Sequence, residues 1–146
     1  MTAVLTAERS RHLPVAAPRI HPRDLRWLAR TTRAAARSDH PWQIAALVVR
    51  GASVVACATN RFRNDPLIVA DKLWCASEHA EMAALRAVKD PAGTTMYVAR
   101  VGADGTGRYA RPCARCDAAL AAAGVTRVVW TCDTNYMTLP AGHGAA

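Results

Sequence analysis

Apolar residues follow two different spacings in the first part of the chain. Over residues 24–37 they recur every three or four positions, which predicts a helix with one buried face. Residues 42–50 and 54–58 are short apolar runs rich in β-branched side chains, as strands are. Gly51-Ala52 between the runs favours a tight hairpin with glycine at its first central position. The expected buried face of the helix carries Leu25, Leu28, Thr32 and Ala35, and Arg23, Arg26, Arg30, Arg33 and Arg37 line much of the rest.

Helix and strand patterns alternate after a polar loop at residues 59–72. The expected elements are a helix that holds His79 and Glu81 and ends near residue 89, a strand at 94–101, a glycine-rich loop, a helix at 113–123 and a strand at 126–131. Gly124 suits the left-handed position after a helix. Such alternation implies parallel strands joined by helical crossovers. The pattern therefore predicts an α/β fold, a three-layer α/β/α sandwich with a mixed sheet of four or five strands.

The short segment after the fourth strand limits how it can pair. Residues 132–146 cannot hold both a parallel crossover of about a dozen residues and a further strand. An antiparallel return needs only a tight turn, for which Asp133 and Asn135 are suitable. We therefore expect residues 136–140 to pair antiparallel with the preceding strand, or to form no strand. The alternative is a loose tail that folds over the functional site and brings Tyr136 near a ligand.

Composition and charge indicate one globular domain with anionic partners. The chain has 146 residues, of which 51% are hydrophobic, and no apolar run is long enough to span a bilayer, so no membrane partner is expected. We assign the domain to residues 23–140, between a flexible tail at 1–22 and a short tail at 141–146. The net charge of +8 favours nucleotides or nucleic acid as partners, although an arginine-rich composition can also be a general bias.

Two of the cysteines have a spacing typical of metal or redox sites. Cys113 and Cys116, in the segment PCARC, share one face at the start of a helix, where thiolates are stabilised. Such a pair is a soft half-site for zinc, although redox pairs use the same spacing. Cys75 is a rival ligand, and we expect Cys57 and Cys132 to be small buried hydrophobic residues on strands. The odd cysteine count and the lack of a secretory signal favour a cytoplasmic protein.

His79 and Glu81 supply the complementary chemistry in the segment EHAEM. A catalytic zinc takes three protein ligands and a water, and His79 is the histidine that falls within an expected core element. A carboxylate beside the metal, here Glu81, can take a proton from that water and pass it to a leaving group. The order H-x-E followed by P-C-x-x-C is the signature of zinc-dependent nucleobase deaminases.

On these two motifs, residues 24–131 resemble the cytidine deaminase-like superfamily. The resemblance implies that His79, Cys113 and Cys116 bind Zn²⁺ and that Glu81 is the catalytic proton shuttle. HAE together with PCARC is most similar to the deoxycytidylate deaminases and phage-type enzymes, because free cytidine deaminases usually have cysteine in place of His79. Transfer-RNA adenosine deaminases and the deaminase domain of riboflavin synthesis share HAE but usually have glutamate where this chain has Arg111.

Further residues are candidate substrate contacts. By the resemblance, Asn60 touches the substrate sugar, although an asparagine in this place also forms turns, and Ala80 lies between the two motif residues at the substrate. Arg108 and Arg111, with Arg100, could meet a phosphate or could be solvated loop charges.

Two aromatic residues complete the expected site. Tyr109 could stack on a base or cap the core, and Trp74 could help to line a groove for a single strand.

The expected function is hydrolytic deamination of cytosine in a (deoxy)nucleotide or nucleoside, by a zinc-activated water with Glu81 as proton shuttle. A first alternative is deamination of cytosine or adenine in single-stranded DNA or RNA, which the positive charge favours. A second alternative is a non-catalytic zinc module that binds nucleic acid, which would not require Glu81. Whether the chain forms a homo-oligomer stays open.

Overall fold

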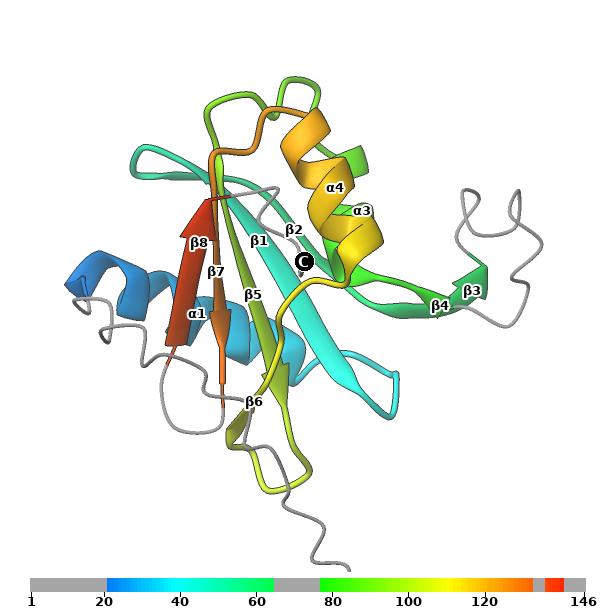
Figure 1. Cartoon of the computed structure of the whole chain (residues 1–146). Helices are drawn as coiled ribbons and strands as arrows, with labels where there is room; N and C mark the ends of the chain where they lie inside the picture. The colour runs from blue at the N-terminus through cyan, green and yellow to red at the C-terminus, as the bar shows by residue number, and fades with distance from the viewer. Residues whose placement is uncertain (1–20, 65–76, 133–135, 141–146) are drawn as a thin grey trace, which may run out of the picture.

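The structure is a computed structural model that describes residues 21–64, 77–132 and 136–140 (Figure 1). Among these residues, no helix combines the length and the apolar character needed to cross a membrane. The elements are α1 (Pro22–Ala35), β1 (Gln43–Arg50), β2 (Ser53–Thr59), β3 (Arg61–Asn64), β4 (Ser77–Glu78), α3 (Ala80–Arg86), β5 (Thr95–Val101), β6 (Gly107–Arg108), α4 (Ala114–Ala122), β7 (Arg127–Thr131) and β8 (Tyr136–Pro140).

The main sheet is mixed, as the alternating pattern predicts. Its strands follow the order β2-β1-β5-β7-β8, and the short β6 also pairs with β5. Strand β1 runs antiparallel to β2 and β5, whereas β5 and β7 are parallel and are joined through α4. The tight hairpin between β1 and β2 is confirmed, because Gly51 adopts a φ of 60°. Gly124 has the expected left-handed φ of 86°, and a Cβ atom there would lie 3.0 Å from Ala92 Cα.

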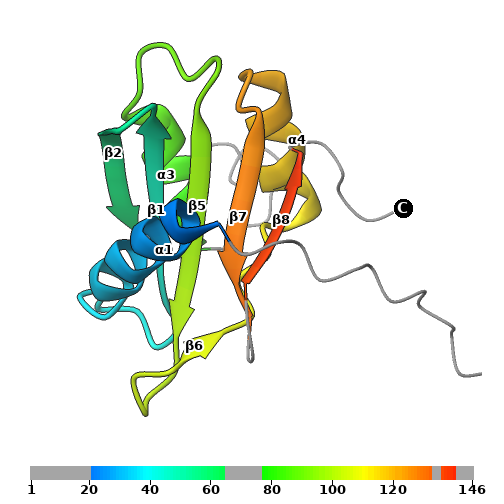
Figure 2. The ribbon, with the colours of Figure 1, turned by 90° about the vertical axis from the view of Figure 1, so that its left-hand side faces the viewer.

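Helices cover both faces of the sheet, which confirms the three-layer sandwich (Figure 2). Because side chains alternate along a strand, neighbouring residues serve different layers. Leu47, Tyr97 and Val129 pack with Trp27 and Leu28 of α1. The residues beside them in sequence, on the opposite face, pack with Ala84 of α3 and Leu120 of α4; these are Ala46, Val48, Met96, Val98, Val128 and Trp130.

The final strand pairs as the length argument predicts. Strand β8 is antiparallel to β7, with Arg127 opposite Pro140 and Thr131 opposite Tyr136. The segment is therefore an edge strand of the main sheet rather than a loose tail over the functional site.

The expected buried face of the first helix is partly wrong. Leu28 and Ala35 are buried as expected, but Leu25 is 47% exposed and Thr32 is half-buried, while Asp24, Trp27 and Thr31 turn inward. Two causes act together, since Trp27 offers a larger apolar surface than Leu25 and Asp24 has an ionic partner on the sheet. The helix also begins two residues earlier than expected, at Pro22, where proline fits the first helical turn.

Three local predictions also need correction. The polar loop contains β3, which pairs with β4 in a separate two-stranded sheet, and the glycine-rich loop contains β6. Neither short strand has an alternating apolar pattern, so backbone pairing alone defines them. The helix after His79 ends at Arg86, before residue 89.

A buried charge cluster fixes α1 to the sheet. The Asp24 carboxylate is 2% exposed and accepts hydrogen bonds from both terminal nitrogens of Arg127 on β7, at 3.0 and 2.6 Å. The Tyr97 hydroxyl on β5 donates to the same carboxylate at 2.8 Å. Burial alone would raise the pKa of Asp24, but the hydrogen bonds from Arg127 and Tyr97 and the guanidinium charge lower it below the ordinary value.

We expect Arg127→Met to destabilise the fold by about 2–3 kcal/mol at neutral pH, because a buried carboxylate loses its cation. Because the pKa of Asp24 is lowered in the folded state, its ionic contacts stabilise the wild type fully above about pH 4, the pKa of an aspartate in the unfolded chain. This stabilisation is lost as the pH falls through the pKa of Asp24 in the folded protein. Urea unfolding should therefore show a gap between wild type and variant that narrows below about pH 4. Arg33→Met, at an exposed position of α1, is the control and should unfold like wild type. Equal urea midpoints for Arg127→Met and wild type at pH 7 would contradict the role of the cluster.

Candidate functional site

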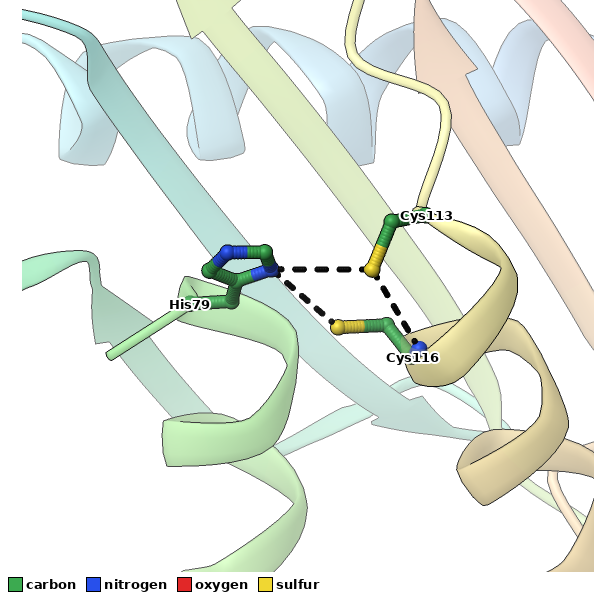
Figure 3. Close-up of side chains that lie close together, drawn as sticks. All are labelled: His79, Cys113 and Cys116. Atoms are coloured by element: carbon green, nitrogen blue, oxygen red, sulfur yellow. Dashed lines mark hydrogen bonds between the residues drawn. The ribbon is translucent and has the colours of Figure 1, made fainter. Parts of the chain in front are cut away.

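Three potential metal ligands meet where two helices begin. His79 occupies the N-cap position of α3 without a side-chain cap hydrogen bond, Cys113 caps the start of α4, and Cys116 lies in the first turn of α4. The His79 Nδ1 atom lies 3.7 Å from Cys113 Sγ and 3.4 Å from Cys116 Sγ. Figure 3 shows the three side chains pointing toward one another across the gap between the helices. The predicted set of His79, Cys113 and Cys116 is thus brought together by the fold.

The donor set and its spacing fit a zinc ion. Bonds of about 2.3 Å to sulfur and 2.0–2.1 Å to nitrogen in a tetrahedron place nitrogen and sulfur roughly 3.5 Å apart. Hydrogen bonds from Cys116 and His79 lower the pKa of Cys113 to about 3, which favours the thiolate that a metal needs. The ligand atoms lie within 4.8 Å of one another, and no fourth histidine, cysteine or carboxylate among the described residues joins them. Three ligands leave a position for a water or a substrate.

Glu81 lies beside this cluster in the first turn of α3. Its side chain is only 6% exposed, and it lines the same cavity as His79 and Cys113. Burial raises the pKa of Glu81 above that of an ordinary glutamate. A buried carboxyl group with a raised pKa holds its proton more readily than an exposed glutamate does, which suits a group that must accept a proton and pass it on.

The cluster opens into a cavity of about 310 Å³. Some of its lining residues come from the loop before β1 and from β1 itself, and others come from the starts of the two helices. The lining residues are His40, Trp42, Ile44, Asn60, Ser77, His79, Glu81, Arg111 and Cys113. A cavity of this volume suits a single ring with its attached sugar.

Asn60 lines the cavity and also holds its wall in place. The Asn60 Oδ1 atom accepts hydrogen bonds from the Ser38 hydroxyl at 2.6 Å and the Ile44 amide at 3.1 Å, while Nδ2 donates to the Trp42 carbonyl at 2.5 Å. An amide group has two N–H donors, so the second can face a ligand in the cavity. The side chain is therefore more than a turn former, because it joins the end of β2 to the start of β1.

The remaining predicted contacts divide into those at the cavity and those away from it. Arg111 lines the cavity, with its guanidinium 5.7 Å from the centre of the Trp130 ring. Ala80, the first residue of α3, is buried and does not line the cavity. Arg108 instead binds Asp104 and Thr106 within its own loop, and Tyr109 is 53% exposed and outside the cavity lining.

Trp74 lies outside the described residues, as does the rival ligand Cys75.

Sequence reasoning missed four of the residues that line the cavity. His40, Trp42, Ile44 and Ser77 line the cavity, and none of them belongs to a recognisable motif. Trp42 is 58% exposed, and the Arg100 guanidinium lies 4.1 Å from the centre of its ring.

The prediction that Cys57 is buried is wrong, since β2 is the edge strand of the sheet and leaves it exposed; Cys132 is half-buried.

A family model agrees with the geometry of the site. The model of the cytidine and deoxycytidylate deaminase zinc-binding region matches residues 22–132, more than half of the chain. The chain belongs to this family. Its metal is accordingly Zn²⁺, as the two thiolates and the imidazole predict. A comparison with curated protein sequences gave no match.

A phage deaminase of low sequence identity shares the fold, and a further match lies at a lower structural similarity. The dCMP deaminase of cyanophage S-TIM5 in its apo form has a TM-score of 0.57 and 19% identity, over 79% of this chain and 87% of that one. The same phage enzyme in complex with dCMP and dUMP gives 0.51 and 17%, over 76% and 82%. Acinetobacter baumannii RibD gives 0.48 and 24%, over 75% of this chain and 28% of the other.

We expect the purified protein to contain about one zinc per chain, measured by atomic absorption. Replacing Cys113 with serine removes a thiolate ligand and should lower the zinc content to a small fraction of that value. Cys57→Ser removes an exposed thiol from the edge strand and should keep the full zinc content. Wild-type zinc content in the Cys113→Ser protein would rule out this ligand assignment.

Proposed function

We propose that His79, Cys113 and Cys116 hold one zinc ion and that the protein catalyses hydrolytic deamination of a cytosine base carried on a nucleotide. The observation that carries the proposal is the position of Glu81, a buried carboxyl group in the same cavity as the metal ligands. A zinc module that only binds a partner would have no need to bury an acid there at a cost in solvation.

The chain's own residues account for the proton movements of the reaction. When bound, zinc would lower the pKa of a coordinated water toward neutrality and so supply the nucleophile. Glu81 takes the proton from the water and delivers it to the ring nitrogen next to the carbon that carries the amino group. The water oxygen bonds to that carbon, and Glu81 takes the remaining proton from this oxygen and passes it to the amino nitrogen. The carbon–nitrogen bond then breaks, ammonia leaves, and the ring keeps the oxygen as a carbonyl. The raised pKa of Glu81 suits a group that must both accept and donate.

A deoxynucleotide is the first substrate to test. Two of the similar structures are a phage dCMP deaminase, one of them with dCMP and dUMP bound. The chain carries a net charge of +8, and Arg111 stands in the cavity wall, where its guanidinium can meet a phosphate. Deamination of cytosine within a single strand is the second candidate, favoured by the basic and aromatic residues beside the cavity.

Glu81→Gln should retain zinc and lose ammonia release. The amide preserves the size of the side chain but cannot carry the proton, so turnover should fall by about 10²–10⁴-fold. The assay is ammonia release across cytosine, deoxycytidine, dCMP and a single-stranded oligonucleotide, with zinc content measured on the same sample. If wild-type protein with full zinc releases no ammonia from any of these, the proposed enzymatic function fails and the non-catalytic module remains.

Arg111→Ala should separate nucleotide from nucleoside recognition. Loss of a charge-assisted contact to the phosphate should raise the KM for dCMP by about tenfold, with a much smaller change for deoxycytidine. Arg108→Ala is the matched control, because Arg108 is bound to Asp104 away from the cavity and its loss should leave both KM values unchanged. Equal changes for dCMP and deoxycytidine in the Arg111→Ala enzyme would contradict a phosphate contact.

A further inference from the structure

A second cavity of about 380 Å³ adjoins the first. The two share His40 and Asn60, so these residues form the wall between them. The proposed reaction uses nothing on the far side of this wall. The second cavity therefore lies next to the proposed position of the reacting base and could bind a further chemical group.

The second cavity combines cations with an exposed aromatic platform. Arg37 and Arg61 line it, and Asp39 is its only acid among the described lining residues. Phe62 is 71% exposed and stacks on His40, with ring centres 4.4 Å apart and planes at 25°. A single exposed aromatic ring is common on protein surfaces, but this one stacks on a second ring at a cavity that two arginines also line. Cations for a phosphate and a flat ring for a base are the features of sites that bind single-stranded nucleic acid.

A row of arginines leads from α1 to this cavity. The members recur every three or four residues on the exposed face of the helix and just beyond its end: Arg23, Arg26, Arg30, Arg33 and Arg37. The guanidinium groups of Arg26 and Arg30 lie over the Trp27 ring. None of the five arginines forms an ion pair with another residue in the described part of the chain. Arg37, the last of them, lines the second cavity. Positive charge thus continues from the helix to the edge of the active site.

We propose that this protein takes its target cytosine from a single-stranded polynucleotide, with the adjoining nucleotide in the second cavity and the backbone beyond it on the arginine row. The inference rests on the proposed function and names its substrate class. A mononucleotide fills only the first cavity and leaves the Phe62–His40 platform and Arg61 unused. A duplex does not fit, because a paired base cannot enter a cavity lined by buried groups such as Glu81. Arginine and aromatic contacts accept any neighbouring base.

Binding is measured with the zinc-loaded Glu81→Gln protein, so that the readout is independent of turnover. The probes are fluorescein-labelled 15-mers of deoxythymidine or uridine with one central cytosine, titrated by fluorescence anisotropy at several salt concentrations. Phe62→Ala should weaken binding by about tenfold. Arg33→Glu should weaken it too and lower the slope of log affinity against log salt by about 0.7 for each phosphate that the variant no longer neutralises.

Lys89→Glu is the matched control, because it makes the same charge change at an exposed position near the start of β5, at the far end of the sheet. It should bind like the parent protein. Thermal unfolding of every variant checks that the fold is kept, and the two test positions are exposed.

Three results would overturn the inference: no binding of either 15-mer, equal weakening by Lys89→Glu and Arg33→Glu, or binding to phosphatidylserine vesicles without binding to the oligonucleotides. Tight, Phe62-dependent binding to the 15-mer supports it. Ammonia release from dCMP without oligonucleotide binding removes the inference and leaves the proposed function intact. Oligonucleotide binding without ammonia release from any substrate removes the proposed function instead.

Discussion

The meeting of two helix starts on one face of the sheet is the constraint on which the rest of the site depends. His79 lies more than thirty residues before Cys113 and Cys116, and the three converge because α3 packs on β1 and β2 with α4 in contact beside it. The parallel pairing of β5 with β7 requires α4 to cross over one face, and the right-handed rule for such crossovers selects that face. A change in strand order would separate the thiolates from the imidazole.

One face of the sheet anchors α1, and the other face carries the functional site. On the α1 face, apolar packing and the Asp24–Arg127–Tyr97 cluster fix the helix to the strands. On the other face, the apolar cluster under α3 and α4 reaches the cavity at Ile44, and Glu81 and Asn60 are buried polar residues in the cavity lining. The contacts between α1 and the sheet stabilise the fold away from the site. They help to offset the free-energy cost of burying Glu81 in the site.

The sequence predicted what depends on local pattern, and it missed what depends on distant partners. The alternation of elements, the antiparallel β8 and the gathering of His79 with Cys113 and Cys116 followed from periodicity, chain length and motif spacing. The burial of Asp24 did not, because its partner Arg127 lies 103 residues away. The cavity wall was missed for the same reason, since Trp42 and His40 become lining residues only when β1 is placed beside β5 and α3.

Asn60 connects the fold to substrate recognition more directly than any residue of the motifs. Its side chain holds Ser38, Trp42 and Ile44 through three hydrogen bonds, and it forms part of the wall shared by both cavities. Because each of these bonds involves a buried or half-buried group, the wall cannot shift without leaving a polar atom unpaired. The distance between the two cavities is thus set by hydrogen bonds that join the end of β2 to the start of β1 and to the loop before it. A ligand that spans both cavities must match that fixed spacing, as two successive units of one polymer would.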